Sequence, residues 1–490
     1  MGLRSGAEYI ESLKKRNPTI YCLGEKVDNV LEHPVLKSTV ATVARTYDLA
    51  KNPKYQDLLT AESPLLPKGE RIDRFLKPFT SVDDLVMRQH QIRFLQRRLG
   101  SCALRCTGLG MVNTIWETTF QIDKAKGTHY HDRLKDWLKY LQQNDIYETG
   151  CMMDVKGDRN VRASQQADPD MYLRIVEKRK SGIVVRGAKA NQSGPAISNE
   201  TCIIPSYYGR DEGDAPYAVM FAIPTDEKGI TYIMQHNNSD ALAYTGDERD
   251  LGNPRYGGGF GSTSLMVFDD VFIPNERVFM AGEWEFSRVG VITMGFMARM
   301  WQTGCRPALM ELLTGAAAAA AEANGVANAY HIRNKLIDMT IHSQTVWGLA
   351  LAAAHMGKPA PSGSGIVLPD SLTINVGKYR SVEGYWECCK LANDIAGGMA
   401  TCVPSFKDYD NPETHHWMEK YFVANPAIPT EHRMRIMRLI QCMALSPIAG
   451  GIHQSGGPME NQKIIIGRDG EFEKKMHDAK VLCGILPEED

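Results

Sequence analysis

The sequence predicts an α+β protein in which a helical region is followed by a β region and then by a second helical region. Three observations predict this order. Apolar residues recur at spacings of three and four towards both ends of the chain, and short β-branched runs between glycines and prolines occupy the middle. The chain also has 490 residues, which is too long for a single core. We place the regions at 1–147, 148–282 and 283–490.

The first region is expected to be mainly helical. Apolar spacing predicts helices over residues 7–16, 37–51, 81–98 and 131–143. Ser81 is typical of a helix start, because its hydroxyl can cap the first turn and the carboxylates of Asp83 and Asp84 follow within that turn. The stretch that follows, Gly100–Gly108, also reads as helix.

The middle region is expected to contain short strands. Runs rich in β-branched and aromatic residues cover 182–187, 217–224 and 264–274. Such short strands, separated by loops, are typical of a small barrel or sandwich. The last region returns to helix, with long apolar stripes over 307–324, 327–355, 372–395 and 431–445. Four helices of this kind predict a bundle.

The composition excludes some classes of partner. The formal net charge is −2, so we expect neither a nucleic acid nor a membrane surface as a partner. The chain has no apolar run of membrane-spanning length and no segment of signal-peptide type. Eleven cysteines in a chain without an export signal indicate reduced thiols rather than disulfides, and therefore a cytoplasmic protein.

Two of these cysteines, Cys102 and Cys106, are four residues apart. On a helix they would lie on one face, one turn apart. Thiols placed in this way can bind a metal, form a redox pair or pack in the core, and the spacing alone does not choose among these roles.

Several motifs together resemble one known family. They are Tyr9–Leu13, Gly24–Val27, Thr46–Ala50, Asp154–Arg159, Leu173–Arg179 and Asp394–Gly398. With the helical–β–helical order, they resemble the 4-hydroxybutyryl-CoA dehydratase / 4-hydroxyphenylacetate 3-hydroxylase family of acyl-CoA dehydrogenase-like flavoproteins. The resemblance implies an N-terminal helical domain, a middle β-barrel domain and a C-terminal four-helix bundle. It also implies FAD as cofactor and assembly as a homotetramer.

The resemblance implies three flavin-contacting segments. A flavin needs hydrogen-bond partners around its ring and positive charge near its pyrophosphate. The residues expected to provide these contacts are Met152, Met153, Lys156, Arg159, Gln192, Ser193, Gly397 and Gly398. Taken singly, the first segment would be a charged turn and the second a hairpin. The matching order of all three favours flavin binding.

The resemblance also implies a [4Fe–4S] cluster. The family holds it with three cysteines and one histidine, and Cys102, Cys106 and Cys305 match the cysteines. Thiolates suit iron–sulfur clusters because sulfur is a soft donor. The family's histidine, however, falls on Ala298, which cannot bind iron.

The acid–base residues of the family also differ here. Its catalytic tyrosine becomes Gln302, and the lysine after the third cysteine becomes Arg306. The position of its glutamate falls in Ala449–Gly451, ahead of His453. His453 could act as a base near neutral pH or be a hydrogen-bonded loop residue. We therefore take Gln302, Arg306 and His453 as the candidate catalytic residues.

Three functions are compatible with this pattern. The main one is a lyase or isomerase that uses FAD and a [4Fe–4S] cluster on a hydroxyacyl-CoA or enoyl-CoA, with altered acid–base residues. The alternative is a cluster-free FAD-dependent aromatic hydroxylase of the 4-hydroxyphenylacetate 3-monooxygenase type. The third is a non-catalytic flavoprotein or assembly subunit.

Overall fold

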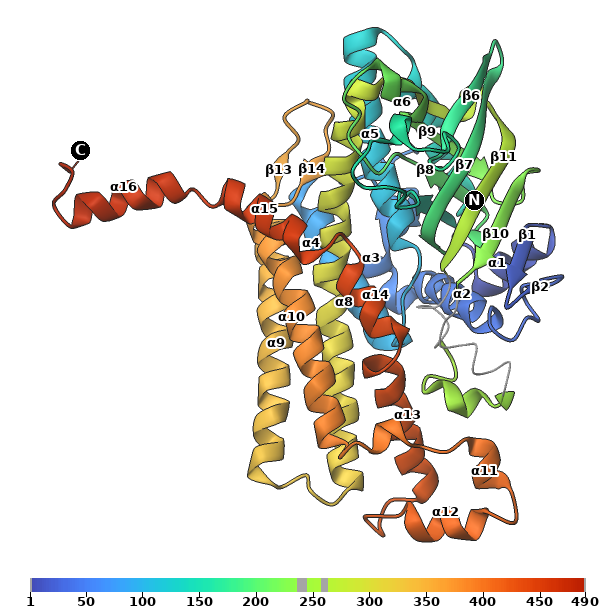
Figure 1. The fold of residues 1–490 in the computed structure, drawn as a ribbon, viewed down its shortest axis with the longest axis vertical. Coiled ribbons are helices and arrows are strands. Elements are labelled where there is room, and N and C mark those ends of the chain that lie inside the picture. The colour runs from blue at the N-terminus through green and yellow to red at the C-terminus, as the bar shows by residue number, and fades with distance from the viewer. Residues whose placement is uncertain (1, 236–244, 257–262, 489–490) are drawn as a thin grey trace.

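The computed structural model describes residues 2–235, 245–256 and 263–488. Its first part is mainly helical, as predicted (Figure 1). Ser81 caps the fourth helix, because its side chain accepts a hydrogen bond from the backbone N–H of Asp84. The helices are α1 (Gly6–Lys14), α2 (Lys37–Lys51), α3 (Gln56–Leu59), α4 (Val82–Leu99), α5 (Cys106–Lys126) and α6 (Tyr130–Asn144).

A six-stranded sheet runs in the order β2-β1-β10-β11-β7-β6. Its strands are β1 (Thr19–Cys22), β2 (Glu25–Lys26), β6 (Arg174–Arg179), β7 (Gly182–Ser193), β10 (Ile230–Met234) and β11 (Thr263–Pro274). Strand β1 pairs in parallel with β10, with Thr19 opposite Thr231. The N-terminal part, predicted to be helical, therefore contributes two strands to this sheet.

A second sheet of four strands has the order β12-β9-β8-β5. Its strands are β5 (Glu148–Cys151), β8 (Glu200–Ile203), β9 (Val219–Pro224) and β12 (Val278–Ala281). The sheets pack on each other through Phe221 and Phe268, whose ring centroids lie 6.0 Å apart, nearly perpendicular. The strand pattern allowed either a barrel or a sandwich. The described residues form two packed sheets, which is the sandwich arrangement. Two short hairpins, β3 (Thr60–Glu62) with β4 (Arg71–Asp73) and β13 (Lys358–Pro359) with β14 (Val367–Leu368), lie outside them.

The last part forms the predicted helical bundle (Figure 1). Its long helices are α8 (Ser287–Ala323), α9 (Tyr330–His355), α10 (Ser371–Ile395) and α13 (Thr430–Ala444). Helix α8 begins well before the predicted start at Pro307, which lies inside the helix. Within the described ranges, no helix combines the length and apolar character needed to cross a membrane.

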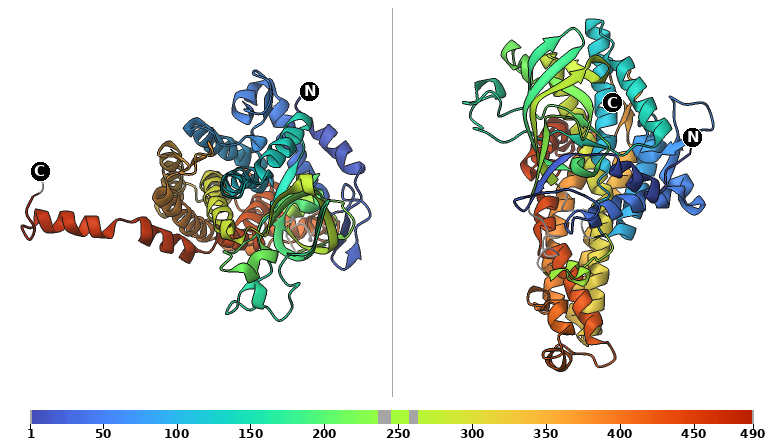
Figure 2. Two further views of the ribbon diagram at one scale, coloured as in Figure 1. Left: turned by 90° about the horizontal axis from the view of Figure 1, so that it is seen from above. Right: turned by 90° about the vertical axis from the view of Figure 1, so that its right-hand side faces the viewer.

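Between residues 396 and 488, which the structure describes throughout, the chain also forms the shorter helices α11 (Phe406–Asp410), α12 (His415–Tyr421), α14 (Pro447–Gln454), α15 (Met459–Asp469) and α16 (Phe472–Leu482). Helix α16 projects away from the body of the molecule (Figures 1 and 2). It has no buried residue, and it exposes Phe472, Met476 and Leu482. An arm with such apolar side chains is typical of a segment that packs on another surface.

Candidate functional site

The two segments expected to contact a flavin ring lie side by side. The first follows β5, and the second is the end of β7. The backbone N–H of Ala190 donates to the carbonyl of Met153 across 2.9 Å, and Gln192 Nε2 donates to the same carbonyl across 2.7 Å. Gln192 thus holds the two segments together rather than standing free at the sheet edge.

A buried ion pair strengthens this junction. Lys189 Nζ lies 2.6 Å from Asp154 Oδ1, and each side chain is 2% exposed. The ammonium also donates to the carbonyls of Met152 and Ile204. Because all three acceptors surround one cation, the pair fixes the start of the first segment against β7. Neither residue was among the predicted site residues.

The predicted pyrophosphate contacts lie on the loop after this junction. Lys156 and Arg159 are both exposed residues. The pKa of Lys156 is lowered, first by partial burial of its ammonium group and then by repulsion from Arg159. The two cations therefore lie on one exposed loop. Ser193, at the end of β7, accepts a hydrogen bond at its carbonyl from Thr149 Oγ1 across 2.8 Å.

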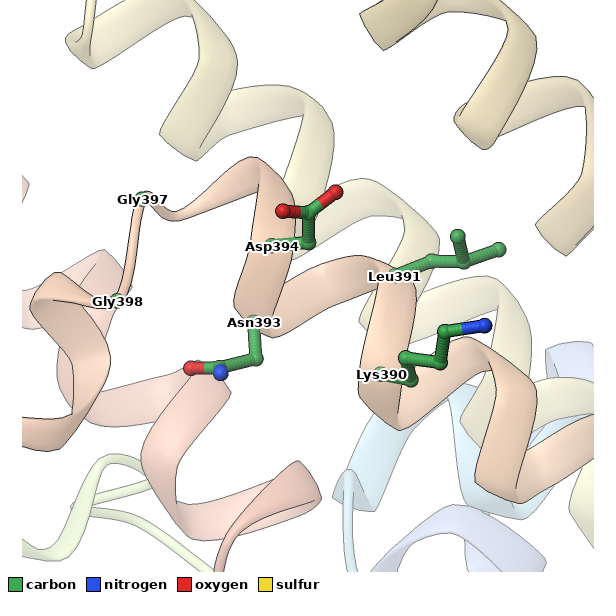
Figure 3. A pocket seen from close by; sticks show the side chains of 6 residues that line it. All are labelled: Lys390, Leu391, Asn393, Asp394, Gly397 and Gly398. Atoms are coloured by element: carbon green, nitrogen blue, oxygen red, sulfur yellow. The ribbon is translucent and has the colours of Figure 1, made fainter.

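The third predicted flavin segment lies away from the sheets, at the end of α10. Gly397 and Gly398 have φ values of +66° and +74°, which a glycine adopts without strain. They border an open hollow of about 460 Å³ (Figure 3). Its other lining residues are Lys390, Leu391, Asn393 and Asp394. A Cβ on either glycine would meet no atom within 4 Å, so this backbone is open to a neighbouring molecule.

Cys102 and Cys106 do not share a helical face. Helix α4 ends at Leu99, Gly100 adopts a left-handed conformation, and α5 begins only at Cys106. Cys102 lies in the loop between them, where its Sγ accepts a hydrogen bond from the backbone of Leu104 across 3.4 Å. The expected helix over this stretch was therefore wrong.

The three cysteines nevertheless lie in one region. Burial raises the pKa of Cys102, and the thiols of Cys106 and Cys305 raise it further. Burial raises the pKa of Cys305, on α8, to about 11, while Arg306 acts in the opposite direction. This mutual influence requires the three side chains to be neighbours.

The three cysteines have the chemistry of the thiolate ligands that hold an iron–sulfur cluster. Arg88 donates to Cys106 Sγ across 3.0 Å and lowers the pKa of that thiol against the effect of burial. The set has no histidine, because Ala298 stands at that position, one turn before Gln302 on α8. As placed, no three His, Cys, Asp or Glu side chains in the described parts of the chain converge to hold a metal ion.

The candidate catalytic residues lie at the junction of α8, α10 and α14. Arg306 is buried, and it donates to Ser381 Oγ across 2.6 Å and to the carbonyl of Ile452. Gln302 is buried against Gly456, and its Oε1 has no hydrogen-bond partner. His453 faces elsewhere, since its Nδ1 accepts a hydrogen bond from the indole of Trp386 across 2.9 Å.

Sequence reasoning missed Lys378, which lies on α10 beside this junction. It is fully buried, and its Nζ has no hydrogen-bond partner. Burial, followed by repulsion from Arg306 and Arg299, lowers its pKa to about 6. A signal was present in the sequence, because Lys378 shares the apolar stripe of its helix with Ile374, four residues before it.

Comparison with known proteins gives a consistent result. Family models for the N-terminal and C-terminal parts of 4-hydroxyphenylacetate 3-hydroxylase match residues 5–280 and 290–484. A 4-hydroxybutyryl-CoA dehydratase/vinylacetyl-CoA-Δ-isomerase of Clostridium aminobutyricum is 38% identical, over 99% of this chain and 100% of that protein.

Solved structures agree with this relationship. An oxygen-tolerant archaeal 4-hydroxybutyryl-CoA dehydratase from N. maritimus superposes with a TM-score of 0.94 at 35% identity, covering 100% of this chain and 96% of that one. The oxygenase component of 4-hydroxyphenylacetate 3-monooxygenase, complexed with FAD, gives 0.84 at 24% identity, covering 98% and 99%. The expected acyl-CoA dehydrogenase-like fold is confirmed, and the chain belongs to the 4-hydroxyphenylacetate 3-hydroxylase family, together with 4-hydroxybutyryl-CoA dehydratase.

Proposed function

We propose that this protein is a flavin-dependent enzyme that dehydrates or isomerises an acyl-CoA, with a hydroxyacyl-CoA or enoyl-CoA as its substrate. The observation that carries the proposal is the junction of the two flavin-type segments through Gln192 and Met153. It occurs in a chain that is similar over its whole length to a dehydratase/isomerase. Its acid–base residues differ from those expected of that group, so the proposal covers other hydroxyacyl-CoA and enoyl-CoA substrates as well.

FAD is the proposed cofactor, and the related oxygenase component is described as complexed with FAD. Exposed Lys156 and Arg159 would bind the pyrophosphate, while Met152, Met153, Gln192 and Ser193 would line the ring. When bound, the flavin supplies one- or two-electron redox chemistry. The hollow beside Gly397 and Gly398 would receive the cofactor of a neighbouring subunit.

We further propose a [4Fe–4S] cluster with three protein ligands, Cys102, Cys106 and Cys305. The proposal is supported by the location of the three thiols in one buried region and by Arg88 and Arg306, which oppose the rise that burial causes in the pKa of Cys106 and Cys305. When bound, the cluster would supply a Lewis acid for a substrate oxygen. The three side chains would have to converge on binding, since they do not form a metal site as placed.

Self-association as a homotetramer belongs to the same proposal. The exposed apolar side chains of α9 (Ile337, Ile341) and α16 (Phe472, Met476) support it, because such residues favour burial against another chain. Sedimentation equilibrium of the purified protein tests the assembly, and a monomer would contradict it.

A cytoplasmic location is part of the proposal. The eleven free cysteines suit the reducing environment of a cytoplasm.

The function is tested on protein purified without oxygen. We expect bound FAD, about four irons and four sulfides per chain, as a [4Fe–4S] cluster requires, and turnover of a panel of 3- and 4-hydroxyacyl-CoA thioesters. Protein that binds FAD but holds no iron would refute the cluster while leaving the flavoenzyme. Protein that binds no flavin would refute the whole proposal.

The role of Cys305 is tested with a matched pair of variants. Cys305→Ser should lose iron, whereas Cys389→Ser, which changes a buried thiol of α10 in the other core of the bundle, should keep it. If both variants retain the wild-type iron content, Cys305 only packs.

The second candidate is a cluster-free, FAD-dependent aromatic hydroxylase. It is favoured by Ala298, which removes a cluster ligand, and by the family models that match both halves of the chain. Such an enzyme would consume oxygen and reduced FAD in the presence of a phenol such as 4-hydroxyphenylacetate. Formation of the catechol product, measured by chromatography, would support it against the main proposal.

A further inference from the structure

Three buried cations lie together between α8 and α10. The proposed reaction assigns them no common role. We name Arg299, Arg306 and Lys378 the cationic cluster; their exposed fractions are 8%, 1% and 0%. Arg299 and Arg306 lie on one face of α8, two turns apart. Helix α10 approaches that face closely, because a Cβ on Gly377 would lie 3.1 Å from the side chain of Thr303.

Among the described residues, no carboxylate contributes to the pKa shift of any member of the cationic cluster. The pKa of Lys378 responds to Arg306, Arg299 and Cys305, and that of Arg306 to Cys305 and Tyr385. The pKa of Arg299 responds to Tyr208 and Arg468. Burial lowers the pKa of each arginine to about 10. Three buried cations without a counter-ion are costly to the free protein.

Two members of the cationic cluster also have unused hydrogen-bond donors. Arg299 Nε and Lys378 Nζ are both buried without a partner among the described residues. Arg306 differs, because Ser381, Ile452 and Ser455 accept its hydrogen bonds. Arg306 is therefore held in place by the protein, whereas Arg299 and Lys378 present donors that a ligand can use.

A group bound by the cysteines does not account for the unused donor of Arg299. Cys305 influences Lys378 and Arg306, yet no thiol influences the pKa of Arg299. Arg299 Nε is therefore open to a ligand other than a group that the thiols hold. A carboxylate suits the chemistry of these two groups, because a guanidinium can bind its two oxygens side by side and an ammonium adds a third, charge-assisted donor.

We propose that Arg299 and Lys378 form a buried binding site for a carboxylate, and that the substrate's acyl chain ends in such a group. The second part rests on the proposed action on an acyl-CoA. The substrate class would then be the CoA monothioester of a short dicarboxylic acid, with Arg306 holding α10 and α14 in place around the site.

Proton linkage gives the site a signature that does not depend on activity. A bound carboxylate stabilises the ammonium of Lys378, so it raises a pKa that burial and the two arginines hold near 6. Carboxylate binding slightly above neutral pH should therefore take up nearly one proton, and the affinity should fall as pH rises.

The test uses calorimetric titration of the purified holoprotein with succinate, in two buffers of different ionisation enthalpy. We expect saturable binding with proton uptake. In Lys378→Met and in Arg299→Met the affinity should fall by about tenfold or more, and uptake should vanish in Lys378→Met. The control Lys463→Met, at an exposed lysine of α15, should bind like the wild type. No binding to the wild type, or equal binding to Lys378→Met, would overturn the proposal.

A second arm separates this inference from the proposed function. Succinyl-CoA should bind more tightly than butyryl-CoA to the wild type, and the preference should disappear in Lys378→Met. If both thioesters bind equally to the wild type, the carboxylate site is refuted and the acyl-CoA function survives. If neither thioester binds while succinate does, the carboxylate site survives and the acyl-CoA function is refuted.

Discussion

Arg88 donates a hydrogen bond from Nη2 to Cys106 Sγ across 3.0 Å, in an interior where both side chains are almost completely buried. Its other arm, Nη1, donates to Gln91 Oε1 across 2.6 Å, and the guanidinium lies over the ring of Phe75. A buried guanidinium whose hydrogen-bond acceptor is a thiol favours the thiolate. Arg88 therefore shifts Cys106 towards the thiolate form that the proposed cluster would need.

Replacing Arg88 should weaken iron binding while the fold persists. In Arg88→Met the thiol of Cys106 loses the cation that lowers its pKa, so we expect iron affinity to fall by about ten- to a hundredfold. Unfolding free energy should change by no more than about 1.5 kcal/mol, because methionine fills much of the same space without a buried charge. Chelator titration measures the first effect and urea unfolding the second. Iron that is held as firmly as in the wild type would contradict this role.

The sequence predicted well those helices that keep one stripe exposed to solvent. Helix α2 covers residues 37–51 as expected, and α10 differs from its prediction by one residue. Helix α5 was not predicted because every residue from Gly108 to Thr119 is buried. A helix surrounded by protein has no alternation of polar and apolar residues for the pattern to detect.

The site was harder to predict than the fold. The resemblance indicated two flavin-contacting segments, and the structure joins them through the hydrogen bond from Gln192 to Met153. Their contact with a flavin stays a prediction. It did not indicate the Lys189–Asp154 pair or Lys378, because a sequence does not reveal which buried charge finds a counter-ion. The spacing of Cys102 and Cys106 was misleading, since the left-handed Gly100 ends α4 before either cysteine.

Gly108 should not tolerate a side chain. A Cβ built on Gly108 in α5 would overlap the carboxylate of Glu148 in β5, and both residues are buried. We expect Gly108→Ala to lower the unfolding free energy by about 1–3 kcal/mol through overpacking. The control is Gly315→Ala on α8, where a Cβ meets nothing within 4 Å and alanine should stabilise the helix by about 0.5–1 kcal/mol. Urea unfolding compares them, and equal stability of the two variants would contradict the expected overlap.

The buried Lys189–Asp154 pair should support both stability and flavin retention. Lys189→Met leaves the carboxylate of Asp154 buried without its cation, which should cost about 3–5 kcal/mol. The double variant Asp154→Asn, Lys189→Met should recover much of this loss, because no uncompensated charge stays behind. Denaturant unfolding and the flavin absorbance of the purified variants measure the two effects. A double variant as unstable as the single one would show that the pair acts in another way.

Glu148 should make the protein less stable as pH rises. Burial raises the pKa of Glu148 from 4.5 to about 8. Between these values the folded chain keeps a proton that the unfolded chain has lost, so unfolding free energy falls with increasing pH. The slope from this one group is at most about 1.4 kcal/mol per pH unit. Asp145, whose pKa burial raises to about 7, adds to the same trend.

Glu148→Gln keeps the shape of the side chain and removes its titration. Urea unfolding between about pH 5 and about pH 8 should therefore give a flatter stability profile than that of the wild type. Parallel profiles for the two proteins would mean that Glu148 does not hold this proton in the folded state.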